Sequence, residues 1–210
     1  MSLKRFFERQ KLQTVIPQRV NFCETVFSYF LEIVLIIDQI ETERFFLRCL
    51  SPDENLDRYL GWMQNVDSFP FIESTNSDYS EDDLKKYIKN INNSSNSIQF
   101  SIFEKYTGLH IGNIKYHDID LKLRSTFVGF LIGDENWQNR GVSLEVFESS
   151  SKVLFQSFKI NLFKLGVNPK HFQAIKSYSK IGFIHSVPYQ RNLLPDNYLL
   201  MAKFIDLTNS

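Results

Sequence analysis

Three consecutive segments between residues 98 and 132 constrain the fold more than any other part of the sequence, because each has the length and apolar pattern of a β-strand. Their sequences are IQFSIFEK, HIGNIKYHDIDL and STFVGFLIG. Gly108 separates the first two segments, and the polar residues 122–125 separate the last two. Such short connections join neighbouring antiparallel strands, so we expect a three-stranded meander.

The residues before the meander predict one strand and two helices. The segment ETERFFLRCL, residues 41–50, has β-propensity without a helical stripe. A capping box of Ser51 and Glu54 predicts the start of the first helix, and a box of Ser80 and Asp83 predicts the start of the second. Apolar residues recur at helical spacing after each box: Leu56, Tyr59, Leu60 and Met63 after the first, and Leu84, Tyr87, Ile88 and Ile91 after the second.

The residues after the meander alternate between helices and strands. We expect a helix over 142–158, a strand LFKLGV, and a helix over 169–181 with Asn168 as N-cap and Gly182 just past its end. The segments FIHSVPY and YLLMAKFI predict two final strands. The whole order is β-α-α-β-β-β-α-β-α-β-β, which indicates an α+β fold.

The composition favours a single sizeable domain. The chain has 210 residues, of which 43% are hydrophobic and 20 are Phe, enough to fill a core. Its 24 basic and 24 acidic residues cancel, so no nucleic-acid partner is expected. Cys23 and Cys49 have no disulfide or metal-binding pattern, and the four His lack zinc-site spacing. We therefore expect reduced thiols and no metal site.

Residues 1–38 predict a helical N-terminal extension ahead of a domain over residues 39–210. The apolar run in the extension, residues 26–37, contains Glu32 and is shorter than the about 20 residues that span a membrane. No small-residue cleavage site follows the run, so a secretory signal is not indicated. We expect a cytoplasmic protein without a transmembrane segment. A membrane-surface or partner-binding helix stays open as an alternative to a helix packed on its own domain.

The segment NWQNRGVSLEVF, residues 136–147, contains one of only 8 glycines in the chain. Gly141 stands after a polar loop and directly before a predicted helix. A glycine there lets backbone N–H groups face outward without a Cβ, and the helix dipole adds partial positive charge. The turn is suited to bind an anion, although the local pattern alone also fits an ordinary turn.

The order of elements and several motifs together resemble the GNAT superfamily of acetyl-CoA-dependent N-acetyltransferases, in particular its ribosomal-protein N-acetyltransferase-like branch. The segments TERFFLR (42–48) and GNIKYHDID (112–120) are similar to two strands of that branch. Gln138, Gly141 and Ser143 resemble its pyrophosphate loop, Glu145 is shared with many relatives, and HFQAIKSYSKIGF (171–183) resembles its later motif. The resemblance covers about residues 41–205. It implies a three-layer fold with a mixed, mostly antiparallel and splayed sheet flanked by helices.

The resemblance also implies where acetyl-CoA binds as co-substrate, without a metal. The backbone of Phe130, Leu131 and Ile132 would pair with the pantetheine arm as if with another strand. The pyrophosphate would rest on the N–H groups of the following loop. The loop residues implied in coenzyme binding are Gln138, Asn139, Arg140, Gly141, Val142 and Ser143.

Two further positions carry roles by the resemblance. His171 stands where relatives have an Asn that contacts the pantetheine arm, so we expect it to contact the coenzyme, and a first-turn surface position is the alternative. Tyr178 stands at the position of the general acid that protonates the leaving thiolate. A tyrosine in the helix core is the alternative there. No general base is implied: Glu73, His117 and Asp118 are polar candidates, and a water chain is another route.

These observations predict an enzyme that transfers an acetyl group to a primary amine by direct attack in a ternary complex. A catalytically inactive GNAT-like module that binds an acyl-CoA or a partner is the alternative. The acceptor stays open between a protein N-terminus, an amino sugar, a polyamine and a small amine. The loop between the two early helices, NVDSFPFIESTNSDY, is expected to shape its pocket. A homodimer is also left open.

Overall fold

The computed structural model describes residues 39–72, 75–186 and 198–206, which form one mixed sheet with helices on both faces. The sheet has eight strands in the order β1-β2-β3-β4-β5-β6-β8-β7. The strands are β1 (Ile40–Glu41), β2 (Phe45–Arg48), β3 (Ile98–Glu104), β4 (His110–Asp120), β5 (Ser125–Ile132), β6 (Leu162–Val167), β7 (Ile184–His185) and β8 (Leu199–Phe204). The helices are α3 (Asp57–Gln64), α4 (Glu81–Asn92), α5 (Val142–Phe158) and α6 (Phe172–Ile181), with a short 3-10 helix η1 (Glu135–Trp137).

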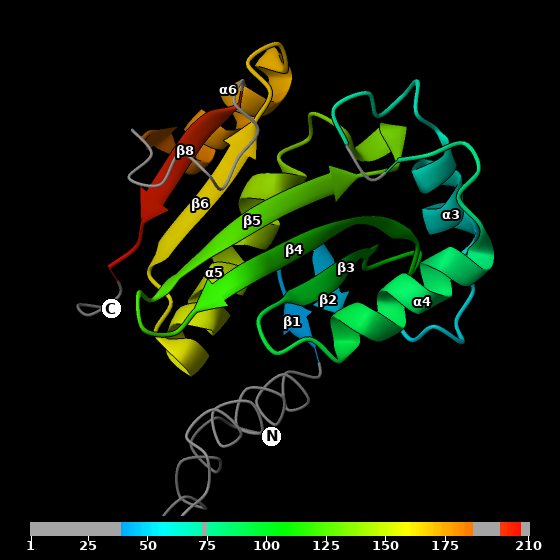
Figure 1. Cartoon of the computed structure of the whole chain (residues 1–210), viewed down its shortest axis with the longest axis horizontal. Coiled ribbons are helices and arrows are strands. Elements are labelled where there is room, and N and C mark those ends of the chain that lie inside the picture. The colour runs from blue at the N-terminus through cyan, green and yellow to red at the C-terminus, as the bar shows by residue number, and fades with distance from the viewer. Residues whose placement is uncertain (1–38, 73–74, 187–197, 207–210) are drawn as a thin grey trace, which may run out of the picture.

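The β5–β6 pair divides the sheet, because it is the single parallel pair among the described strands. Its pairing covers Ser125 to Phe127 of β5 opposite Leu162 to Lys164 of β6. Beyond Phe127, β5 continues to Ile132 with β4 alone as its paired neighbour. Figure 1 shows β5 and β6 diverging toward one end of the molecule. The predicted meander, β3 to β5, and the predicted mostly antiparallel, splayed sheet are therefore confirmed.

Helices cover the two faces of the sheet, which makes three layers. Phe100 and Ile102 of β3 join the core cluster that contains α5 side chains, whereas Phe103 joins the cluster under α3 and α4. Successive strand residues point to opposite faces, so the two clusters lie on opposite sides of the sheet. The larger cluster is held by fully buried rings such as Phe147 of α5 and Phe163 of β6, in edge-to-face contact at 5.2 Å.

Three predicted boundaries are wrong. The predicted strand 41–50 is a hairpin, β1–β2, with a turn closed by Thr42 and Phe45. The first helix starts at Asp57 and not at Ser51: the Glu54 carboxylate accepts from the Ser51 N–H at 2.7 Å, as the box predicts, but the Ser51 hydroxyl accepts from the Asp53 N–H and not from that of Glu54. Helix α6 starts at Phe172 and not at Pro169, because the Asn168 side chain caps a turn by accepting from the Lys170 N–H.

Other local predictions hold. The Ser80–Asp83 capping box is present with both of its hydrogen bonds. Gly182 ends α6 in the left-handed region at φ 98°. The order of elements agrees with the prediction once the hairpin is counted as the first strand. The predicted extension, residues 1–38, lies outside the described residues. Among the helices that the structure describes, none is both long and apolar enough to cross a membrane.

Candidate functional site

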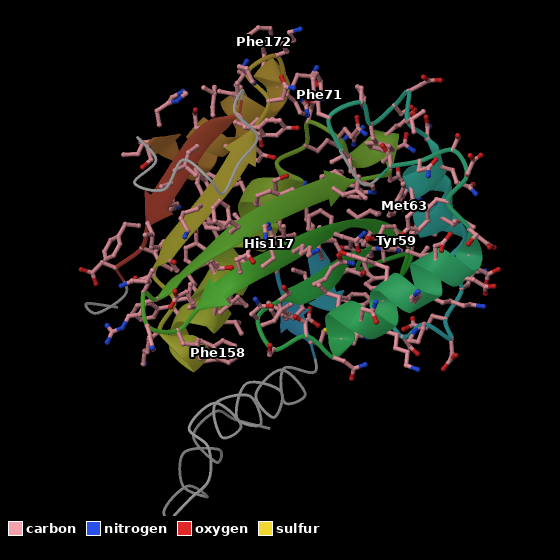
Figure 2. All side chains as sticks on the ribbon, in the orientation of Figure 1. Tyr59, Met63, Phe71, His117, Phe158 and Phe172 are labelled. Carbon is pink, nitrogen blue, oxygen red and sulfur yellow. The ribbon has the colours of Figure 1, made fainter. Side chains whose placement is uncertain are left out.

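A cavity of about 480 Å³ lies at the end of the sheet where β5 and β6 diverge. Its walls are the last residues of β5, the loop between η1 and α5, the first two turns of α6, and residues 67–72 of the α3–α4 loop. Phe71 and Phe172, which Figure 2 labels at this end of the molecule, both line it. Eight of the predicted site residues line the cavity: Phe130, Leu131, Ile132, Gln138, Asn139, Ser143, His171 and Tyr178.

The end of β5 presents one backbone edge toward this cavity. The Gly133 N–H donates to Ile111 O of the β4 edge at 3.0 Å, which sets the phase of the antiparallel ladder. Bonded and non-bonded pairs alternate, so the N–H and C=O groups of Phe130 and Ile132 point away from β4. The Ile132 carbonyl accepts a hydrogen bond from the Gln138 side chain at 3.1 Å. The Phe130 groups thus face the space that β6 has left, where an extended ligand could pair with them.

The loop before α5 is shaped to bind an anion. Asn139 and Gly141 both have left-handed backbone conformations, with φ 59° and φ 75°, while Arg140 between them does not. Such alternation turns successive N–H groups toward one concave side. No described residue accepts a hydrogen bond from the N–H groups of residues 139–144, and Gly141, the N-cap of α5, provides no side-chain cap. The helix therefore begins with free donors and its positive dipole end directed at the same place.

Three predicted coenzyme residues, Arg140, Gly141 and Val142, do not line the cavity. Val142 is buried in the main core at 2% exposure, where it anchors the start of α5. Arg140 is exposed, and its carbonyl accepts a hydrogen bond from Arg44 at 3.1 Å. A Cβ at Gly141 would meet only Arg44, at 3.9 Å, so the positive φ and not crowding explains glycine at this position.

Tyr178 combines a packed ring with a hydroxyl that no described residue engages. Its ring packs against Phe130 and Phe183 at centroid distances of 5.7 and 6.3 Å. A hydrogen bond from the Phe183 N–H to the Tyr178 carbonyl at 3.0 Å, made possible by Gly182, fixes the end of its helix. Burial raises the pKa of the hydroxyl to about 12, so it is a proton donor throughout the neutral range.

His171 closes the cavity together with an aromatic side chain that the sequence analysis did not single out. Its ring stacks on Phe71 with centroids 4.4 Å apart and planes inclined by 21°. Burial lowers the pKa of His171, which favours the neutral imidazole. Phe71 belongs to the loop expected to shape an acceptor pocket. The FPF sequence of that loop, Phe69 to Phe71, was the available signal for it.

The candidates for a general base do not meet at the cavity. The His117 Nδ1 and the Asp118 carboxylate pair with each other at 2.9 Å on β4. His117 lies opposite Phe127, where β5 is still paired with β6, and neither residue lines the cavity. Glu73 lies outside the described residues. Among residues 39–72, 75–186 and 198–206, no group of three or more His, Cys, Asp or Glu side chains gathers that could hold a metal ion.

Helix α3 contacts the first residues after β5, where the chain leaves the strand toward η1 and α5. The Arg58 side chain donates to the His110 carbonyl at 2.9 Å and pairs with the Asp134 carboxylate. Gly133, the residue after β5, lies against Trp62, and a Cβ there would be 2.0 Å from the indole. A larger residue at this position would push α3 away from the strand. The direction in which the chain leaves β5 is therefore set by packing against α3.

The comparisons with known proteins identify a family and a shared fold. The sequence model of the acetyltransferase (GNAT) domain matches residues 44–184. No curated protein sequence matches the chain. Its fold is shared by the ribosomal-protein-S5-alanine acetyltransferase of Vibrio fischeri, with 14% identity, a TM-score of 0.62 and coverage of 79% of this chain and 96% of that chain.

Two further solved structures share the fold. One is RimJ of Mycobacterium smegmatis in complex with CoA-disulfide, with 13% identity, a TM-score of 0.66 and coverage of 82% of this chain and 90% of that chain. The other is a spermidine N-acetyltransferase SpeG chimera from Vibrio cholerae and hSSAT, with 16% identity, a TM-score of 0.61 and coverage of 77% and 96%. At these identities the likeness concerns the fold alone.

Proposed function

The chain belongs to the GNAT family of acetyltransferases, and from this premise we propose that it transfers the acetyl group of acetyl-CoA directly to a primary amine in a ternary complex. One observation carries the proposal. A strand edge, an anion-binding loop and a protonated tyrosine hydroxyl meet at one cavity. The strand edge suits the amide-rich arm of the co-substrate, the loop suits its pyrophosphate, and the hydroxyl suits its thioester.

The coenzyme binds by backbone contacts in this proposal. The pantetheine arm pairs with the Phe130 N–H and C=O, since these groups face the space between the diverging strands. The pyrophosphate accepts hydrogen bonds from the N–H groups between Asn139 and Ser143, at the positive end of α5. His171, neutral and stacked on Phe71, lies beside the arm.

The chemical step needs a neutral amine and a proton for the leaving group. The amine loses a proton through water, and its lone pair then attacks the thioester carbonyl carbon. The nitrogen releases its surplus proton to water, the carbon–sulfur bond breaks, and the thiolate takes the proton of the Tyr178 hydroxyl. Water then returns a proton to the tyrosinate, so the amide, the free thiol and the starting tyrosine remain. A phenol with a pKa of about 12 stays protonated until the sulfur acquires charge. Holding both substrates in one cavity supplies much of the rate acceleration by proximity.

The acceptor is a primary amine, and its class is to be found by experiment. Solved structures with this fold include enzymes named for a ribosomal protein and for spermidine, so protein N-termini and polyamines are the first acceptors to try. Amino sugars and small amines complete the panel. We place the reaction in the cytoplasm. Release of free thiol from acetyl-CoA with any of these amines supports the proposal.

Titration calorimetry with acetyl-CoA tests the loop. Gly141→Val forces a β-branched residue into a left-handed conformation, so we expect coenzyme affinity to fall by roughly 10- to 100-fold. Gly108→Val is the matched control, because Gly108 has φ 67° and open surroundings but lies in the β3–β4 turn. It should lose similar stability and keep its affinity.

Two results would contradict the proposal. If Gly141→Val keeps the parent affinity while folded, the loop is only a turn. If the parent binds acetyl-CoA but releases no thiol with any amine, the chain is an inactive coenzyme-binding module.

A further inference from the structure

Arg44 and Glu145 form a polar cluster that joins the β1–β2 hairpin to the first turn of α5. Glu145 accepts hydrogen bonds from the Thr42 hydroxyl at 2.6 Å, from the Arg44 backbone N–H at 2.7 Å and from the Arg44 Nε at 2.7 Å. The carboxylate is thereby tied to a segment about a hundred residues away in the sequence. The cluster is partly buried, with the Glu145 side chain at 19% exposure, so solvent screens it less than a surface pair.

Arg44 also reaches the loop that is proposed to bind the pyrophosphate. Its Nη2 donates to the Arg140 carbonyl at 3.1 Å. Arg140 stands between the two left-handed residues Asn139 and Gly141, so this bond holds the middle of the concave N–H array. The guanidinium lies against the rings of Phe45 and Trp137, at 4.9 and 5.9 Å from their centroids, which fixes its direction.

The negative charge of Glu145 lies close to the proposed pyrophosphate site, and Arg44 neutralises it. A carboxylate in the first helical turn is favourable for the helix alone, but it repels an anion bound at the same helix end. Burial alone would raise the pKa of Glu145, yet the hydrogen bonds from Thr42 and Arg44 hold it below its usual value, so the group stays charged. The adjacent guanidinium cancels this charge and leaves the helix end able to attract a pyrophosphate.

We propose that Arg44 is a positioning residue for the coenzyme: with Glu145 it holds the backbone of residues 139–143 in its anion-binding conformation and neutralises the carboxylate beside the pyrophosphate. This inference rests on the proposed function. Arg44 acts through the loop, so its effect is confined to ligands that carry the pyrophosphate. Ligands that reach only the strand edge and Tyr178 are indifferent to it.

The experiment compares acetyl-CoA with S-acetylpantetheine, which has the same thioester and arm but no pyrophosphate. For Arg44→Ala, we expect the affinity for acetyl-CoA to fall roughly tenfold, the loss typical of a charge-assisted hydrogen bond. KM for acetyl-CoA rises accordingly while kcat changes little. The kcat/KM with S-acetylpantetheine should equal that of the parent.

Arg48→Ala is the matched control in the same hairpin, at the end of β2. Arg48 pairs with Glu54 at 2.6 Å, donates to a backbone carbonyl at 3.1 Å and lies over the Phe103 ring at 4.5 Å, so it repeats every type of contact that Arg44 makes. It touches the turn before α3 and not the coenzyme loop. Its removal should lower the melting temperature about as much as Arg44→Ala and leave both substrates unaffected.

A double variant separates charge from shape. If charge cancellation is the larger part, Arg44→Ala combined with Glu145→Gln should recover part of the affinity that Arg44→Ala alone loses. If the double variant recovers no affinity, the effect of Arg44 comes from its hydrogen bond to the Arg140 carbonyl. The comparison of the two substrates then tests the positioning role.

Three outcomes overturn the inference. The first is an unchanged acetyl-CoA affinity in folded Arg44→Ala. The second is an equal loss for acetyl-CoA and S-acetylpantetheine, which would mean that Arg44 supports the fold in general. The third is failure of the parent to bind acetyl-CoA at all, which would also remove the proposed function, whereas the first two leave that function intact.

Discussion

Two clusters of aromatic and titratable side chains lie on opposite faces of the sheet and differ in one respect. The closed cluster, Tyr59, Tyr87, Gln99 and His110, lies beneath α3 and α4. The open cluster, Phe130, Tyr178 and Phe183, lies between β5 and α6. Both contain groups that burial shifts toward the neutral form. In the open cluster, however, a polar group reaches the cavity.

Hydrogen bonds within the protein satisfy the titratable groups of the closed cluster. The Tyr87 hydroxyl donates to Gln99 at 2.8 Å, and the Gln99 amide donates to the Tyr59 hydroxyl at 3.3 Å. The His110 Nε2 lies 3.0 Å from Gly112 O and 3.1 Å from Asn113 Oδ1. Because both partners are acceptors, that nitrogen carries the proton. The pKa of Tyr59 is raised to about 12 by burial, as is that of Tyr178.

The comparison teaches that a shifted pKa does not by itself identify a functional group in this protein. Tyr59 and Tyr178 have the same shift and the same main cause. Tyr178 differs because it lines the cavity and because no described residue forms a hydrogen bond with its hydroxyl. Access and a free hydrogen-bonding position separate a reactive group from a structural one.

The largest expected effect comes from removing the one hydroxyl of the open cluster. Tyr178→Phe keeps the ring contacts with Phe130 and Phe183 and removes only the hydroxyl. We expect kcat to fall by roughly 10²- to 10⁴-fold, with little change in coenzyme affinity or melting temperature. Steady-state kinetics and calorimetry measure these quantities. A Phe variant as active as the parent across pH 6–9 would show that Tyr178 is a core residue and nothing more.

The second prediction concerns how the unfolding free energy depends on pH through His110 of the closed cluster. Burial lowers the pKa of His110 from its ordinary value of 6.5 to about 4, so near pH 5 the unfolded chain binds a proton that the folded protein does not. The stabilisation is complete above pH 6.5 and is lost as the pH falls to about 4. Relative to His110→Gln, the parent should lose on the order of 3 kcal/mol of unfolding free energy over this range.

Denaturant unfolding of the parent and of His110→Gln at several pH values checks this prediction. The kcat of the folded His110→Gln variant should match that of the parent, because His110 does not line the cavity. Parallel pH profiles of the two proteins would mean that His110 takes up its proton equally in the folded and unfolded states.

The smallest effect removes one hydroxyl from the closed cluster. Tyr87→Phe leaves the buried Gln99 Oε1 without its donor at 2.8 Å, and we expect a loss of about 1–2 kcal/mol of stability. Thermal unfolding measures it, and turnover per folded molecule should stay the same. A drop in kcat without a drop in stability would contradict the distinction between the two clusters.

Local sequence patterns predicted the helices and strands well wherever the interactions that form them are local. The Ser80–Asp83 box and Gly182 at the end of α6 follow from residues within one helical turn. The Ser51–Glu54 box formed only in half: Glu54 accepts from the Ser51 N–H, but the Ser51 hydroxyl accepts from Asp53, and the helix begins only at Asp57. Sequence spacing records which residues can form a cap, but not whether a helix follows it directly.

The candidate site was predicted in part. The family motif located Tyr178 and the loop from Gln138 to Ser143, and the structure brings Tyr178, Gln138, Asn139 and Ser143 to one cavity. The same reasoning did not separate Val142, which is buried in the core, from the residues that line the wall. It also missed Phe71, whose contact with His171 joins two segments a hundred residues apart.

The sequence by itself determined the order of elements, the glycine that opens α5 and the membership of a family, because these depend on near neighbours and on motifs. Only the tertiary structure shows where the cavity lies. The cavity opens where the β5–β6 pairing stops, after Phe127, and the Arg44–Glu145 ion pair joins the first hairpin to the start of α5 beyond it. Strand divergence and long-range ion pairs arise from the packing of segments far apart in the chain, and no local pattern of residues records them.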